Sequence, residues 1–327
     1  LKKDNEKEDE VKKQVEVLNI EGMTVKEAEK ALKTKIVDLF SNNGQTIFAP
    51  SFEASSILLD KSKVKKLLYK LRIPTPKFGI FEKQNMAMDY IKNLSQPFVI
   101  KTNEPLSAVI VTDKNVAKKV IDFHFMEKQQ RVIIEDYLWG IPFCFYAITD
   151  GYNALPVGSS VIYKHSLNGN GGQLTSGMGA SSPNNKLSID KEKYIMKKVI
   201  CPTLNHLVEE DAVYVGIIGV NGIITESGDI QVLGYQTFMQ DSDCAAILEL
   251  IGDDVDMYEL FMSCIIGSFS DEYENISLKN RSATTVVLTC TNTNNSENSI
   301  SGLENLDEDI NLIFYPSVVK NKYLITY

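Results

Sequence analysis

A glycine-rich stretch at residues 171–183, which reads GGQLTSGMGASSP, constrains this chain more than any other feature. Gly177 and Gly179 would let backbone N–H groups turn inward and approach an anion closely, where a side chain would obstruct them. A bare Gly-Met-Gly run is equally typical of an ordinary flexible surface loop. We expect a helix at 191–208 after it and strands at 214–218 and 230–233. With these elements behind it, the stretch is interpreted as an anion-binding loop centred on 175–180.

Length and composition exclude several classes of protein. The 327 residues predict two or three domains with proper cores. The net charge of −9, without a basic stripe, argues against a nucleic-acid partner. No apolar run approaches the ~20 residues that span a bilayer, so no membrane span is expected. The first residue is Leu1, so we expect the chain to have been processed or trimmed before it.

The cysteines and histidines indicate no metal or disulfide framework. There are five cysteines, an odd number, scattered and without a CxxC spacing. That pattern is typical of buried thiols in a reducing compartment, so we expect an intracellular location, either the cytoplasm or an organelle matrix. The three histidines are not close to any cysteine in sequence, so a histidine-based metal site has little support.

The N-terminal third predicts short pieces of regular structure. Residues 1–14 alternate lysine with acidic residues, and we expect a disordered charged arm. A short strand at 15–20 is followed by a capping box at Thr24–Glu27, a helix to Phe40 and a second strand at 46–49.

Three later segments carry a recognisable order of motifs. Residues 60–76 (DKSKVKKLLYKLRIPTP) predict an amphipathic helix that ends before Pro74, and residues 97–101 (PFVIK) predict a strand. Residues 131–140 (RVIIEDYLWG) follow, and then a hairpin of 143–148 with 153–159 around Asp150-Gly151. With the glycine-rich stretch, this order resembles the phosphoribosylamine–glycine ligase (glycinamide ribonucleotide synthetase) family of ATP-grasp proteins.

The resemblance implies an α/β (α+β) ATP-grasp fold with a truncated N-terminal Rossmann-like remnant and a partial C-terminal β-rich domain. The expected boundaries are 15–59 for the remnant, 60–265 for the ATP-grasp region, with a lid subdomain at about 76–142, and 266–327 for the C-terminal part. The nucleotide-binding positions that the resemblance implies are Lys63, Lys101, Glu135, Tyr137 and Leu138. The implied substrate and phosphate positions are Lys164, Thr175, Gly177, Met178, Gly179, Ala180 and Asp241.

Two of these residues also have interpretations that do not depend on the family. Lys63 is equally well explained as a solvated helix lysine. Lys101 ends an apolar strand, where an inward ammonium group is costly unless an anion or a carboxylate pairs with it. For Trp139, the only tryptophan, a core or interface anchor is favoured over stacking on a ligand.

The chain departs from the family pattern wherever chemistry would occur. Residues 102–109 (TNEPLSAV) replace a glycine-rich phosphate flap, and Glu104 adds negative charge there. Ile141 stands where the family binds the ribose hydroxyls with a glutamate. The positions of the family's two Mg²⁺ ligands carry Gly234 and Gln236, and Phe238 replaces a phosphate-binding arginine. Mg²⁺ needs hard oxygen ligands, normally including a carboxylate, so we expect no metal site.

These departures predict a degenerate family member without catalysis, acting as a scaffold, regulatory or assembly subunit with protein partners, and with residual nucleotide or sugar-phosphate binding. No cofactor is expected on this interpretation, and no residue is assigned a catalytic role. The alternative is an active ATP-dependent ligase that joins glycine to 5-phosphoribosylamine in purine biosynthesis, with ATP and Mg²⁺ as cofactors. Asp241 and Asp243 lie near the altered metal positions, but compensation by these two is not favoured.

Overall fold

The computed structural model describes residues 40, 44–104, 107–127, 131–288, 298–299, 305, 317–320 and 323–326. The chain divides into two compact units, Leu1–Val286 and Val287–Tyr327. The predicted arm at 1–14, the strand at 15–20 and nearly all of the helix at 24–40 lie outside the described residues. Within the described part, no helix is long and apolar enough to cross a membrane.

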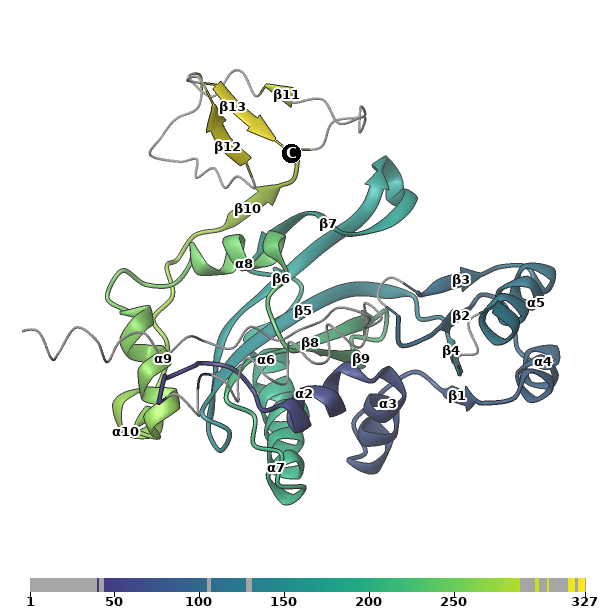
Figure 1. Ribbon diagram of the computed structural model, residues 1–327, viewed down its shortest axis with the longest axis horizontal. Coiled ribbons are helices and arrows are strands. Elements are labelled where there is room, and N and C mark those ends of the chain that lie inside the picture. The colour runs from purple at the N-terminus through teal and green to yellow at the C-terminus, as the bar shows by residue number, and fades with distance from the viewer. Residues whose placement is uncertain are drawn as a thin grey trace, which may run out of the picture. The chain divides into compact units, whose positions relative to one another are not determined.

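The larger unit contains two antiparallel sheets. The small sheet has the strand order β1-β4-β2-β3, with bounds Phe78–Phe81, Val132–Asp136, Phe98–Lys101 and Val109–Val111. The large sheet has the order β10-β7-β6-β5-β8-β9, with bounds Ala283–Val286, Gly171–Ser182, Ala154–Leu167, Gly140–Thr149, Gly216–Thr225 and Ile230–Gln236. The small sheet lies at one end of the large one, beside β8 and β9 (Figure 1).

Two helices cover one face of the small sheet. They are α4 (Gln84–Lys92) and α5 (Lys114–Asp122), which a π-helical turn extends to Glu127. Both are amphipathic, and their apolar stripes pack on the inward-facing strand residues. The buried residues of this core are Ala87, Ile91, Phe98, Ile100, Val111, Ala117, Ile121, Val132 and Ile134. This two-layer part falls within residues 76–142, and its role as a lid stays a prediction.

Alternation along β5 builds a core on each face of the large sheet. Phe143, Phe145 and Ala147 point to the face covered by α2 (Phe52–Leu59), α3 (Lys61–Lys70) and the helical run of α6 (Ile189–Ile195) and α7 (Cys201–Glu209). Cys144, Tyr146 and Ile148 point to the opposite face, covered by α8 (Asp241–Leu248), α9 (Met257–Ile266) and α10 (Phe269–Glu272).

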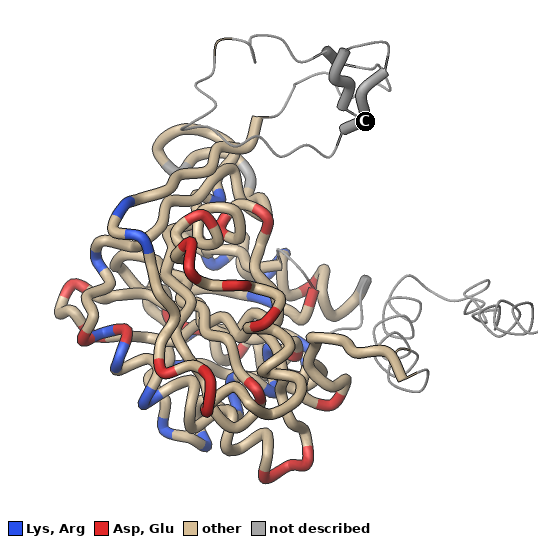
Figure 2. Tube along the Cα trace, turned by 90° about the vertical axis from the view of Figure 1, so that its left-hand side faces the viewer, with Lys and Arg blue, Asp and Glu red and all other residues tan. Residues whose placement is uncertain are grey.

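The smaller unit contributes a three-stranded antiparallel sheet of order β11-β13-β12, formed by Asn298–Ser299, Tyr323–Thr326 and Ser317–Lys320. The surface charge of the larger unit is mixed: Figure 2 shows both basic and acidic positions along its helices and loops.

The structure contradicts two predicted elements. Residues 46–49 form no strand. The segment instead contributes Phe48, whose ring stacks on Phe261 with centroids 4.5 Å apart, so side-chain packing places it. The glycine-rich stretch is not a loop: its residues belong to β7, between β6 and β10. The glycines serve close strand packing there, since Gly177 lies against Ser242 and Gly179 against the backbone of Thr285.

Candidate functional site

Three lysines gather around one buried glutamate where α3 meets the small sheet. Lys65 Nζ lies 2.7 Å from Glu135 Oε2, and Lys101 Nζ lies 2.6 Å from Glu135 Oε1. Lys65, Lys101 and Glu135 are all buried. Lys61 comes one helical turn before Lys65, is partly buried, and donates to the Glu104 carbonyl at 2.6 Å and to Ser107 Oγ at 3.2 Å. We call Lys61, Lys65, Lys101 and Glu135 the lysine cluster.

The pKa values of the cluster reflect burial and crowding of like charge. Burial lowers the pKa of Lys65 to about 8, against the opposing pull of Glu135. Burial, followed by repulsion from Lys101, lowers the pKa of Lys61 to about 8. Burial alone would raise the pKa of Glu135, but the ammonium groups of Lys101 and Lys65 outweigh it and hold that pKa below its ordinary value. The site therefore favours a further negative charge.

The two lysines predicted to bind a nucleotide, Lys63 and Lys101, lie in different surroundings. Lys101 and the predicted Glu135 form a direct ion pair. Lys63 is exposed on α3, whereas Lys61 and Lys65 lie on the side of the helix that meets the small sheet. Sequence reasoning missed Lys61 and Lys65, although their spacing of four residues places both on one helix face.

The segment that replaces the family's flap is fastened by its own side chains. Ser107 Oγ accepts from the Thr102 N–H at 3.0 Å and donates to the Thr102 carbonyl at 2.9 Å. The Glu104 N–H donates to Thr102 Oγ1 at 3.3 Å. Glu104 and Ser107 also line a cavity of about 430 Å³ that continues over Lys119. The Glu104 carboxylate partly offsets the burial and the repulsion from Lys101 that lower the pKa of Lys61.

A second polar group lies on the large sheet, at the positions where the resemblance puts the metal. The Tyr146 hydroxyl bonds to Gln236 Oε1, and it also lies 2.6 Å from Asp243 Oδ2. Ser160 Oγ donates to the same Asp243 oxygen at 3.3 Å. Burial raises the pKa of Asp243, against these two hydrogen bonds. We call Tyr146, Ser160, Gln236 and Asp243 the tyrosine network.

The residues present do not fit Mg²⁺ in the manner of the family. Gly234 offers no ligand, and a Cβ atom built there meets no atom within 4 Å, so the space beside it is open. The oxygen of Gln236 and one oxygen of Asp243 are engaged by the Tyr146 hydroxyl. Across the residues that the structure describes, no group of three His, Cys, Asp or Glu side chains could hold a metal ion. A carboxylate-containing oxygen set, which Mg²⁺ requires, is not assembled.

The remaining predicted residues lie along β6, β7 and the start of α8. Thr175 Oγ1 donates to the Lys164 carbonyl at 3.0 Å and accepts from the Gly177 N–H at 3.1 Å. Met178 is partly buried, Gly179 and Ala180 are buried, and Asp241 is exposed. Thr175 thus uses its hydroxyl to fasten the hairpin rather than to reach outward.

The segment that contains the predicted nucleotide-binding residues Tyr137 and Leu138 joins the two sheets. Tyr137 and Leu138 are partly buried between β4 and β5. Trp139 is 65 % exposed and meets the Tyr137 ring edge-on, with centroids 4.9 Å apart, so it is not a core anchor. Ile141 is 38 % exposed at the start of β5 and offers no polar group.

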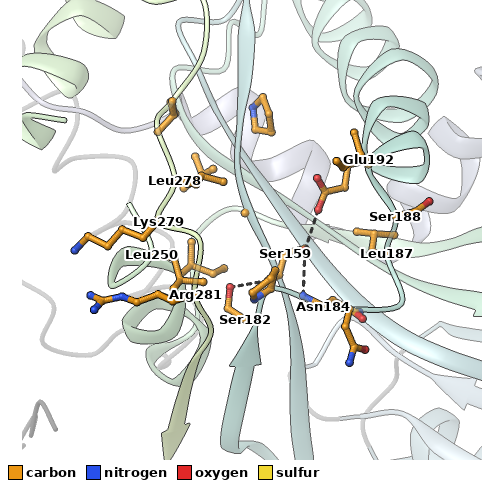
Figure 3. A pocket seen from close by; sticks show the side chains of 18 of the residues that line it. Ser159, Ser182, Asn184, Leu187, Ser188, Glu192, Leu250, Leu278, Lys279 and Arg281 are labelled. Carbon is orange, nitrogen blue, oxygen red and sulfur yellow. Dashed lines mark hydrogen bonds between the residues drawn. The ribbon is translucent and has the colours of Figure 1, made fainter. Parts of the chain in front are cut away.

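Another cavity, of about 380 Å³, lies beside β6 (Figure 3). Three of its polar side chains have partners: Ser159 Oγ donates to Glu192 Oε1 at 3.0 Å, Lys279 pairs with Asp253 at 2.7 Å, and Arg281 pairs with Glu249. Because both cationic side chains of this cavity are already paired with carboxylates, the lysine cluster is the stronger candidate for an anionic ligand.

Comparisons with known proteins identify the family of this chain. Residues 59–244 match the family described as phosphoribosylglycinamide synthetase, ATP-grasp (A) domain. The phosphoribosylamine–glycine ligase of Clostridium acetobutylicum is 31% identical over 261 residues, covering 77% of this chain and 62% of that protein. The chloroplastic phosphoribosylamine–glycine ligase of Arabidopsis thaliana is 26% identical over 302 residues, covering 88% of this chain and 55% of that protein. This chain therefore spans less than two thirds of either relative.

Solved structures show the same fold. The phosphoribosylamine–glycine ligase of Thermotoga maritima superposes with a TM-score of 0.71 at 22% identity, covering 85% of this chain and 71% of that one. The biotin carboxylase of Campylobacter jejuni gives a TM-score of 0.60 at 16% identity, covering 78% and 56%. The predicted ATP-grasp fold is confirmed. Since the family match takes in more than half of its residues, the chain belongs to the phosphoribosylglycinamide synthetase family of ATP-grasp proteins.

Proposed function

We propose that this chain is a non-catalytic member of the family that keeps a binding site for a phosphate-bearing ligand at the lysine cluster. The observation that carries the proposal is the contrast between two parts of one fold. Lys65, Lys101 and Glu135 form a buried ion-pair group, whereas Gly234 has no side chain at a position where the resemblance puts a carboxylate.

Phosphoryl transfer depends on positioning and charge neutralisation, because the protein supplies little covalent chemistry of its own. In this chain Phe238 is an exposed apolar residue at a position where the resemblance implies a phosphate-binding arginine. Ile141 offers no acceptor to a ribose. Binding of an anion needs only the ammonium groups, so it survives changes that would abolish turnover.

The second candidate is the active ligase that joins glycine to 5-phosphoribosylamine. Membership in the family favours it, as does the intact pair of Lys101 and Glu135. Fold alone does not fix function, so the altered site weighs against it. A scaffold or assembly role with protein partners stays a prediction, as does a reducing compartment for the free thiols Cys144, Cys201, Cys244 and Cys264.

The test is ADP formation with Mg²⁺, ATP, glycine and phosphoribosylamine, run beside the Clostridium acetobutylicum relative as a positive control. We expect no ADP above the level measured without glycine, together with a rise in melting temperature on adding ATP in at least one metal condition. A ligand at 100 times its Kd stabilises a protein by ~2.7 kcal/mol, a shift that is easily measured. ADP formation that depends on both glycine and phosphoribosylamine would establish the ligase instead.

A further inference from the structure

The tyrosine network puts a hydroxyl where a cation would be needed. Tyr146 OH lies between an amide oxygen of Gln236 and a carboxylate oxygen of Asp243, and all three residues are buried. The Tyr146 hydroxyl, which has one proton to donate, therefore occupies the space between these two oxygens. Binding a cation here would require breaking a buried hydrogen bond and moving the Tyr146 ring, which is fully enclosed.

The lysine cluster has more positive than negative charge. Lys61, Lys65 and Lys101 bring three ammonium groups, while Glu135 and the nearby Glu104 bring two carboxylates, so one positive charge is left over. Buried charge is stabilised only when it is paired. Burial, and after it repulsion from Lys101, lowers the pKa values of both Lys61 and Lys65.

The lysine cluster and the altered metal position are linked through one short chain of hydrogen bonds. Lys65 Nζ donates to Thr75 Oγ1 at 2.7 Å, and Thr75 Oγ1 donates to the Val232 carbonyl at 2.7 Å. Val232 lies on β9, two residues before Gly234. The ammonium group of Lys65 is therefore linked, through Thr75, to the strand that carries Gly234.

From these contacts we infer that the site takes a di- or triphosphate that carries no divalent cation, with the ammonium groups of Lys61, Lys65 and Lys101 neutralising the phosphates in place of Mg²⁺. This inference rests on the proposed function. A bound Mg²⁺ would cancel much of the ligand's charge, and at position 234 it would meet an open space where the resemblance puts a carboxylate. The chemistry recognised is a polyphosphate chain, whether it belongs to a nucleotide or to an inorganic polyphosphate.

The experiment is isothermal titration of the full chain with ATP and, separately, with tripolyphosphate, each in EDTA and in excess Mg²⁺. We expect binding in EDTA and at least ~10-fold weaker binding when Mg²⁺ complexes the ligand, since a charge-assisted contact is worth ~1.5–3 kcal/mol. Equal affinity for the two probes would assign recognition to the phosphate chain alone. Tighter binding of ATP would assign part of it to the nucleoside.

Two variants of α3 make a matched pair. Lys61→Gln and Lys66→Gln each remove one positive charge from α3, but Lys66 is exposed and only Lys61 belongs to the lysine cluster. We expect Lys61→Gln to weaken binding of both probes by ~10-fold and Lys66→Gln to leave it unchanged. Tighter binding in Mg²⁺ than in EDTA would overturn the inference while sparing the proposed function. Binding in neither condition would overturn both.

Discussion

Gly179 and Gly234 show how differently two strand glycines can be constrained. A Cβ atom at Gly179 would lie 2.5 Å from the Thr285 carbonyl oxygen, a backbone atom that cannot move without disturbing β10. A Cβ atom at Gly234 would meet nothing within 4 Å. We expect Gly179→Ala to destabilise the chain by ~1–3 kcal/mol, as overpacking does, and Gly234→Ala to stay within about 0.5 kcal/mol of the parent.

The measurement is the midpoint of urea denaturation for both variants. Equal midpoints would show that strand packing does not require Gly179. At the scale of single residues, the sequence correctly indicated that positions 177 and 179 have no room for a side chain. It attributed this to the close approach of an anion, whereas the structure shows packing against the protein itself. The neighbours that exclude a Cβ atom come from α8 and β10, more than 60 residues away along the chain, and no local pattern reveals them.

Among the elements, helix α3 matters most for the candidate site. Its N-terminus is capped by Asp60 Oδ1, which accepts from the N–H groups of Ser62 at 2.8 Å and Lys63 at 3.0 Å. Helix α9 is capped in the same way by Asp256, which accepts from Tyr258 and Glu259. The two caps are chemically equivalent, but only α3 carries lysines of the cluster.

We expect Asp60→Ala and Asp256→Ala each to cost ~0.5–2 kcal/mol of stability, because each loses two hydrogen bonds to orphan backbone donors. Only Asp60→Ala should also weaken the binding of ATP in EDTA, since Lys61 is the first residue of the helix that it caps. Denaturation midpoints and titrations of both variants test this. Equal ATP affinity in the two would mean that the cluster does not depend on the α3 cap.

Most elements of the larger unit could be predicted from periodicity and turn chemistry. The helix at 61–70, the strands β2, β5, β6, β8 and β9, and the hairpin around Asp150-Gly151 follow from such signals. The failures arose where tertiary contacts outweigh local preference. Residues 46–49 resemble a strand but pair with no strand in the part of the chain that the structure describes. Residues 171–182 resemble a loop but pair on both sides.

At the scale of the whole molecule, the site is assembled from segments far apart in the sequence. Tyr146 meets Gln236 and Asp243 across 90 and 97 residues, and Lys65 reaches Glu135 across 70. The sequence predicted that the metal ligands at 234 and 236 were altered, because that is visible position by position. It could not predict that a tyrosine from another strand would engage the oxygens that remain.

Restoring two ligands alone should therefore not restore a ligase. Gly234→Glu combined with Gln236→Asn supplies a carboxylate and a short amide, and the open space beside Gly234 admits the new side chain. Tyr146 would still hold Asp243 at 2.6 Å, Glu104 would still face the phosphates, and Ile141 would still offer the ribose nothing. Misplacing reacting groups by about 1 Å can itself cost ~100-fold in rate, so a half-rebuilt site should show no activity.

We expect the double variant to fold, judged by an unchanged circular dichroism spectrum, and to form no ADP that depends on glycine and phosphoribosylamine. Turnover would show that the flap, the ribose position and the tyrosine network do not block the reaction. The replacement of the family's metal ligands by Gly234 and Gln236 would then be the whole defect.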